Sequence, residues 1–258
     1  MKVLVADRLS QPGLEIFKQA DNIELDYQPE LSEDQLLKAV VDAEALVVRS
    51  GTHLTAEVFA NAAKLRVVGR AGIGTENIDL AAANRRGLVV MNTPFGSATT
   101  SAEHTIAMLM ALARNIPQAC HSIRQGEWRK DHFQGVEIFG KTLGVVGAGK
   151  IGRLVIKRAI GLRMRILVFD PFLSAEAVQQ MGAEQVELEE LQAQSDFITL
   201  HIPLNSETDK FIDASFLQRL KNGCRIINCA QGGLIDEQAL ADAIQSEHIA
   251  GAALDVFS

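Results

Sequence analysis

The sequence has few cysteines, no excess of positive charge and no long hydrophobic run, and each shortage excludes a class of protein. Its three cysteines, Cys120, Cys224 and Cys229, lack an even count and metal-ligand spacing, so we expect reduced thiols and no metal site. The net charge of −7 argues against nucleic acid or an anionic membrane as the main partner. The longest apolar helical run, 105–113, is too short to span a bilayer. No signal peptide precedes the apolar residues 2–6, and we therefore expect a cytoplasmic protein.

The order of apolar runs predicts two α/β domains. Short β-rich runs alternate with helical patterns, which is typical of βαβ units and of parallel sheets covered on both faces. Expected strands are 2–6, 23–27, 45–49, 66–69 and 88–91, followed by 143–146, 165–169, 197–201, 225–229 and 251–256. We predict two doubly wound parallel sheets, one in residues 1–97 and one in residues 98–258.

Three helix signals stand out. Ser32 and Gln35 have the spacing of a capping box, and Gly87 is a typical residue to follow a helix. A long helix is expected over 100–125, and its middle, 106–113, is apolar on nearly all sides. Such a helix must be buried on several sides, between domains or between subunits, so a homodimer or a larger oligomer is expected.

A glycine motif opens the second domain. Gly147, Gly149 and Gly152 have the spacing G-x-G-x-x-G between an apolar strand and a helical pattern, and a second expected strand ends at Asp170. The first glycine permits a tight turn, the second lets the backbone approach a pyrophosphate, and the third permits close packing of helix on strand. The N–H groups at the helix N-terminus then favour phosphates. A glycine-rich turn without a ligand is the alternative.

Asp170 favours NAD over NADP. A carboxylate at this position can accept both ribose hydroxyls of adenosine, whereas the 2′-phosphate of NADP would meet its negative charge. Residues 171–173 supply no cation to receive that phosphate. Residues 98–258 are therefore expected to form a Rossmann-type NAD-binding domain.

Several segments together resemble the D-2-hydroxyacid dehydrogenase family. Beyond the glycine motif and Asp170, they are 201–203, 228–233 and 252–257 in the second domain, and 48–52, 68–79 and 91–94 in the first. The resemblance covers the whole chain and implies a flavodoxin-like substrate domain, a nucleotide domain, and hydride transfer between C2 of a 2-hydroxy acid and NAD. It is greatest to members that oxidise 3-phosphoglycerate to 3-phosphohydroxypyruvate in serine biosynthesis.

The resemblance also implies which residues meet the ligands. The cofactor would lie against Gly147, Gly149, Lys150, Ile151, Gly152, Asp170, Ile202, Pro203, Cys229, Ala230 and Asp255. A phosphorylated substrate would lie against Arg49, Ser50, Arg70, Ile73 and Gly74, because arginine forks suit phosphate and the loop offers backbone N–H groups. For the arginines, an ordinary surface cation or a salt bridge at the domain junction is the alternative. The helix 100–125 would lie in a dimer interface.

Two departures from the family pattern concern catalysis. The family's turn carries an Arg that polarises the 2-keto oxygen, and Gln231 occupies that position. The family's Glu and His, a general acid/base pair, would lie beyond Ser258, so we expect a truncated piece of a longer protein. None of the six histidines matches that His, and His201 is expected to be structural or to neighbour the cofactor. Because position 231 lacks the charge of the Arg, we expect a catalytic efficiency about 10²- to 10³-fold lower than that of a member with Arg there. NAD binding is expected to be kept.

Three functions remain open from the sequence. The first is a piece of a dehydrogenase that acts on 3-phosphoglycerate. The second is a family member that acts on another D-2-hydroxy acid or on formate. The third is an NAD-binding regulator without catalysis, which Gln231 favours and the acidic charge disfavours.

Overall fold

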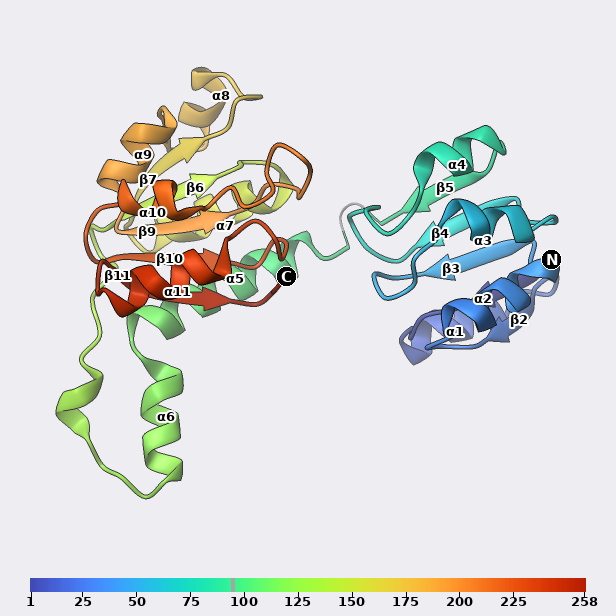
Figure 1. Ribbon diagram of the computed structural model, residues 1–258, viewed down its shortest axis with the longest axis horizontal. Helices are drawn as coiled ribbons and strands as arrows, with labels where there is room; N and C mark the ends of the chain where they lie inside the picture. Colours follow the sequence, from blue (N-terminus) through green and yellow to red (C-terminus); the bar gives the residue numbers. More distant parts are fainter. Residues whose placement is uncertain (94–95) are drawn as a thin grey trace. The chain divides into compact units, whose positions relative to one another are not determined.

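The computed structural model describes residues 1–93 and 96–258 (Figure 1). The chain divides into two compact units, Met1–Ser97 and Ala98–Ser258. Pro94, the last residue of one segment that resembles the family, lies outside the described residues.

The first unit is a five-stranded parallel sheet in the order β2-β1-β3-β4-β5. Its elements are β1 (Lys2–Val5), α1 (Gln11–Lys18), β2 (Glu24–Tyr27), α2 (Glu33–Ala39), η1 (Val40–Asp42), β3 (Ala45–Val48), α3 (Ala56–Asn61), β4 (Val67–Arg70), α4 (Leu80–Arg85) and β5 (Val89–Asn92). This order is that of flavodoxin-like folds. The chain reverses direction across the sheet between β1 and β3, so a crevice forms at the carboxyl ends of these strands.

Successive side chains of a strand point to opposite faces of the first sheet, and different helices cover the two faces. Leu4 and Leu46 point to one face and pack with residues of α2, α3 and α4. Val5 and Ala45 point to the other face, which α1 covers. The predicted capping box of Ser32 and Gln35 is confirmed, since each side chain bonds the other residue's backbone N–H.

The second unit is a six-stranded parallel sheet in the order β11-β10-β9-β6-β7-β8. Its elements are α5 (Ala98–Ala113), α6 (Ile116–Arg124), η2 (Lys130–Phe133), β6 (Thr142–Val146), α7 (Lys150–Gly161), β7 (Arg165–Phe169), α8 (Ala175–Gln180), β8 (Glu184–Gln185), α9 (Leu188–Gln194), β9 (Phe197–Leu200), α10 (Ala214–Gln218), β10 (Cys224–Asn228), α11 (Glu237–Gln245) and β11 (Ile249–Leu254). Helices α5, α7 and α8 cover one face, and α9, α10 and α11 cover the other. The predicted fold class is confirmed.

The single helix predicted over 100–125 is wrong, because the chain forms two helices there. Helix α5 ends at Ala113, and Asn115 adopts left-handed φ and ψ of 51° and 36° before α6 begins. Pro117 would clash with the carbonyl of Ala113 in a continuous helix, so the break is built into the sequence. The apolar middle of α5 packs largely within its own unit, against α7, β10 and β11.

Beyond α5, helix α6 and the segment through η2 extend away from the sheet as an arm (Figure 1). The arm and the segment after it expose large apolar side chains, namely Ile116, Ile123, Trp128 and Phe139. None of the described helices combines the length and the hydrophobicity needed to cross a lipid bilayer.

Candidate functional site

All strands of the second sheet run parallel, so their carboxyl ends meet at one edge. The glycine turn follows β6, Asp170 follows β7, and Ile202 and Pro203 lie just beyond β9. The turn 229–231 follows β10, and Asp255 follows β11. The chain continues from β6 to β7 and β8 on one side and then crosses to β9 on the other side of β6. Ligands of open α/β sheets bind at such a reversal of strand order.

The three glycines of the turn differ in what surrounds them. Gly147 has a φ of +88°, and a Cβ there would lie 2.8 Å from the carbonyl oxygen of His201. A Cβ on Gly152 would overlap the carbonyl of Gly147, so that glycine permits the close approach of α7 to the strand. Gly149 has no heavy atom within 4 Å of the Cβ position and is the N-cap of α7 without a side-chain cap. The turn thus has open space beside an uncapped helix N-terminus, which fits a phosphate group.

Lys150 and Ile151 form the first turn of α7, and Asp170 ties the glycine turn to the next strand. One carboxylate oxygen of Asp170 accepts the N–H of Ala148 at 2.8 Å, and the other accepts the N–H of Phe172 at 3.0 Å. Each oxygen keeps a second lone pair, so the carboxylate can still accept hydroxyl groups. The predicted ribose-binding residue therefore lies beside the predicted phosphate turn.

His201 lies mostly buried at the end of β9, opposite the glycine turn. Burial lowers its pKa to about 4, so the imidazole is neutral near pH 7. Its Nε2 lies 3.1 Å from the hydroxyl of Thr199. The neighbouring Ile202 brings its Cγ2 to within 2.8 Å of the Cβ position of Gly147. His201 therefore fills the wall of the crevice as a neutral side chain, and this favours a structural role over a general base.

Asn228 holds the turn that contains Gln231. Its side-chain oxygen accepts the N–H of Ala230 at 3.0 Å, and its Nδ2 donates to the carbonyl of Gln231 at 2.8 Å. The side chain of Gln231 makes no hydrogen bond within the described ranges. Burial raises the pKa of Cys229, so that thiol stays protonated. The turn geometry thus rests on Asn228 and on backbone atoms, and it does not depend on the side chain at position 231.

The sequence reading missed His104. Its Nε2 lies 3.1 Å from a carboxylate oxygen of Asp255, and both side chains are about half exposed. Asp255 is also held by its own N–H, which donates to the carbonyl of Asn228 at 3.0 Å. The contact between α5 and the end of β11 is remote in sequence, and no local pattern could have indicated it.

In the first unit, the side chains of Asp7 and Asn77 hold the loop that contains Arg49 and Ser50, and the sequence reading assigned neither of them a role. Arg49 and Ser50 themselves are exposed. Asp7 accepts the N–H of Arg49 at 2.6 Å and the N–H of Thr52 at 3.3 Å. Asn77 donates to the carbonyls of Arg49 and Thr52 at 2.7 and 2.6 Å. Asp7 could have been found as an acid that follows a strand, the signal that identified Asp170.

Arg70 ends β4 and is 7% exposed, so it is not an ordinary surface cation. Its Nη2 donates to Glu76 Oε1 at 3.0 Å, and its Nε is buried without a partner. Within the described part of the chain, the N–H groups of Ile73 and Gly74 also make no hydrogen bond. The predicted substrate loop thus contains donors without a partner, namely Nε of Arg70 and the N–H groups of Ile73 and Gly74, in addition to the guanidinium paired with Glu76.

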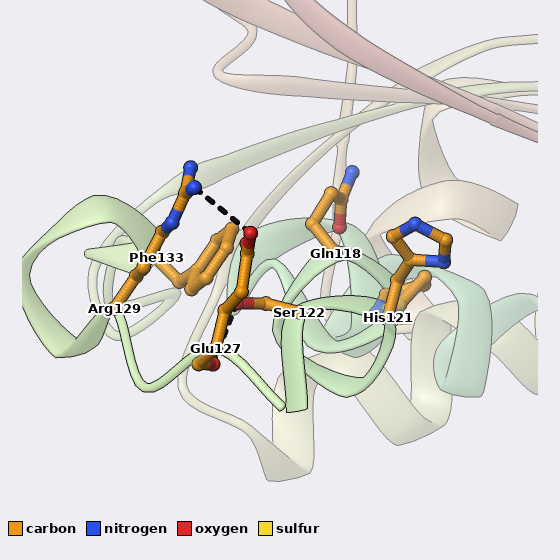
Figure 2. Close-up of a pocket in the computed structure, with 7 residues that line it drawn as sticks. Gln118, His121, Ser122, Glu127, Arg129 and Phe133 are labelled. Atoms are coloured by element: carbon orange, nitrogen blue, oxygen red, sulfur yellow. Dashed lines mark hydrogen bonds and ion pairs between the residues drawn. The ribbon is translucent and has the colours of Figure 1, made fainter. Parts of the chain in front are cut away.

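A separate hollow lies in the arm. It has a volume of about 470 Å³, and its lining is Pro117, Gln118, His121, Ser122, Glu127, Arg129 and Phe133. Figure 2 shows Arg129 paired with Glu127, at 3.1 Å, beside the ring of Phe133. None of the residues predicted to bind cofactor or substrate lines it.

Known proteins resemble the chain along its whole length. It is 46% identical over 257 residues to D-3-phosphoglycerate dehydrogenase of Synechocystis sp., covering all of this chain and 46% of that protein. It is 44% identical over 258 residues to D-3-phosphoglycerate dehydrogenase of Methanocaldococcus jannaschii, covering 49% of that protein. The chain therefore spans about half the length of the curated relatives it matches.

A solved structure and a family model agree with these relatives. The apo structure of D-lactate dehydrogenase from Escherichia coli matches with a TM-score of 0.87 and 31% identity, over 99% of this chain and 82% of that one. Residues 106–258 match the model described as D-isomer specific 2-hydroxyacid dehydrogenase, NAD binding domain. The chain belongs to the D-isomer specific 2-hydroxyacid dehydrogenase family, and its second unit carries that family's NAD-binding domain.

Proposed function

We propose that the protein is an NAD-dependent dehydrogenase that oxidises D-3-phosphoglycerate at C2. The observation that carries the proposal is the carboxyl edge of the second sheet, where an uncapped helix N-terminus, open space at Gly149 and Asp170 lie together. When bound, NAD accepts the hydride that leaves C2 of the hydroxy acid. The similarity to two D-3-phosphoglycerate dehydrogenases supports a phosphorylated substrate.

The protein's own residues divide the work between its two units. In the second unit, backbone N–H groups of the glycine turn, Lys150 and Ile151 face the pyrophosphate, and Asp170 holds the adenosine ribose. Ile202, Pro203, Cys229, Ala230 and Asp255 border the nicotinamide half of the cofactor. In the first unit, Arg49, Ser50, Arg70, Ile73 and Gly74 bind the anionic groups of the substrate.

Gln231 is proposed to weaken catalysis. It stands where the family carries an Arg. The amide of Gln231 offers N–H donors, but it lacks the positive charge and the paired donors of a guanidinium. Because the turn is held by Asn228, the NAD site keeps its shape. A non-catalytic NAD-binding protein is the second candidate function, and Gln231 is the observation that favours it.

An absorbance assay of NADH formation from D-3-phosphoglycerate, with D-lactate in parallel, tests the activity, and calorimetry with NAD tests the cofactor site. We expect NAD binding and slow turnover that prefers the phosphorylated acid. Turnover of D-lactate at an equal or greater rate would favour another 2-hydroxy acid. NAD binding without turnover of either acid would favour the regulator.

The assignment of Asp170 has its own test. Replacing it with Asn removes the charge and keeps an acceptor, and NAD affinity should fall by about tenfold or more, because charged hydrogen bonds contribute ~1.5–3 kcal/mol. Discrimination against NADP should relax at the same time. Equal NAD affinities for the two forms would refute the ribose assignment.

The arm is proposed to bind a second copy of the chain. The arm exposes Ile116, Ile123 and Trp128, the last at 79%, and a group of exposed apolar side chains marks an association surface. Sedimentation should therefore report a homodimer or a larger oligomer, and Trp128→Glu should dissociate it.

A cytoplasmic location also stays a proposal, which the three free cysteines support.

A further inference from the structure

The loop that follows β4 is shaped around one ion pair. Arg70 and Glu76 meet across it, with Nη2 and Oε1 3.0 Å apart. A methyl group on Gly72 would overlap the guanidinium of Arg70, and a methyl group on Gly74 would overlap the carboxylate of Glu76. Both glycines have φ outside the left-handed region, so they leave space for the two side chains of the pair and serve no special backbone conformation.

The two partners differ in their freedom to leave. The side chain of Arg70 is 8% exposed, whereas that of Glu76 is 46% exposed. The carboxylate of Glu76 can therefore turn out into water and stay solvated, whereas the guanidinium of Arg70 stays buried and needs another anion in order to remain paired. The unpartnered Nε of Arg70 and the free N–H groups of Ile73 and Gly74 lie in the same loop, so the loop offers more donors than Glu76 satisfies.

We propose that Glu76 is an internal stand-in for the substrate's anionic group, which displaces it from Arg70 on binding. This inference rests on the proposed function, in which Arg70 binds that group. Glu76 thereby keeps the buried guanidinium paired in the absence of substrate and lowers the affinity of the loop for weaker anions. A substrate oxyanion gains both the guanidinium and the backbone donors, and Glu76 gains full hydration.

Calorimetry on the 258-residue chain tests the displacement without requiring turnover. The probes are D-3-phosphoglycerate, D-glycerate, which has only the carboxylate, and inorganic phosphate. Glu76→Gln removes the competing charge, and it should tighten binding of the displacing anion by about fivefold, the effect of one partly exposed ion pair. The probe whose affinity rises identifies which group reaches Arg70.

A matched control separates displacement from net charge. Asp42→Asn removes the same charge from the exposed pair with Lys64, at the amino edge of the same sheet, and should leave all three affinities unchanged. Equal gains for Asp42→Asn and Glu76→Gln would overturn the proposal. Equal affinities of wild type and Glu76→Gln, with Arg70→Gln abolishing binding, would overturn it while leaving the proposed substrate site standing.

Two glycine variants give a second test that changes no charge. Gly74→Ala should push Glu76 off Arg70 and tighten anion binding, whereas Gly72→Ala should displace Arg70 and weaken it. Weakening by both variants, or by Glu76→Gln, would show that Glu76 only positions Arg70 and would overturn displacement. If NAD binds and no probe binds to any form, both this inference and the proposed substrate site fail.

Discussion

At the scale of single residues, Gln231 is proposed to weaken the reaction and to leave the cofactor site intact. The turn's hydrogen bonds come from Asn228 and from backbone atoms, so the side chain at position 231 is free to change. Sequence comparison located this position because the family's Arg is absent from a recognisable turn. The structure adds that none of the turn's hydrogen bonds within the described residues uses the side chain at position 231.

In a chain that also carries the family's Glu and His, Gln231→Arg is expected to raise kcat/KM for D-3-phosphoglycerate by about tenfold or more, because it restores a charge beside the developing oxyanion. The Kd for NAD should stay the same, since the turn keeps its backbone contacts. NADH absorbance and calorimetry measure the two quantities. Gln231→Lys is the matched control and should recover less, because it supplies charge without the fork. Equal rates for all three forms would mark Gln231 as an adapted residue.

His201 predicts a pH dependence of stability. Its pKa is about 4 in the folded protein and about 6.5 when unfolded, so its neutral form stabilises the fold above about pH 6.5. This contribution is lost as the pH falls from 6.5 toward 4, by about 2 kcal/mol at pH 5. Urea unfolding at pH 7.5 and pH 5 should show a smaller loss for His201→Asn than for wild type. An identical loss would mean that His201 is accessible to protons in the fold.

At the scale of elements, the strand, turn and helix from β6 to α7 form the unit proposed to bind phosphate. Gly147 and Gly152 are required by the fold, because a Cβ on either meets protein atoms. Gly149 is not required by the fold, since its Cβ position is open. The same motif therefore contains two structural glycines and one that leaves room for a ligand.

Gly147→Ala should destabilise the second unit by about 2–4 kcal/mol, because it combines an unfavourable φ with overpacking against His201. Gly149→Ala, the matched control, should leave the unfolding free energy nearly unchanged and weaken NAD binding. Urea unfolding and calorimetry measure the pair. Similar destabilisation by both variants would contradict the distinction between them.

The sequence contains the signal for the break between α5 and α6, but the apolar pattern alone predicted one continuous helix. Pro117 and the left-handed Asn115 end one helix and begin another, and Asn115 also donates to the carbonyl of Gln134 across the arm. The apolar pattern alone favoured one helix, because it continues across the break. Local backbone sterics prevailed over that pattern.

At the scale of the whole molecule, the two units have separate cores and are proposed to bind separate ligands. NAD at a hundredfold excess over its Kd should stabilise the second unit by about 2.7 kcal/mol and leave the first unit's core unaffected. Amide hydrogen exchange measures the stabilisation of each unit separately. Added protection is expected at the carboxyl ends of β6, β7 and β9. Equal protection of the core of β1 and β3 would indicate that the units unfold together.

The family resemblance located Gln231, and the sequence by itself determined the α/β class, the glycine turn and the position of Asp170 after a strand. These are local features, because strand periodicity, turn glycines and an acid after a strand depend on neighbouring residues. Sequence reading did not single out the short α3, α9 and β8, since brief elements carry too few residues to establish a period.

Only the tertiary structure decided which residues far apart in the sequence meet. Asp7 with Arg49, Asn77 with Thr52, and His104 with Asp255 are separated by 42, 25 and 151 residues. Parallel strands carry their carboxyl ends to one edge, and loops from remote parts of the chain then supply each other's hydrogen-bond partners. The ion pair of Arg70 and Glu76 is close in sequence, yet its burial and its fit over two glycines arise from the packing of the folded loop.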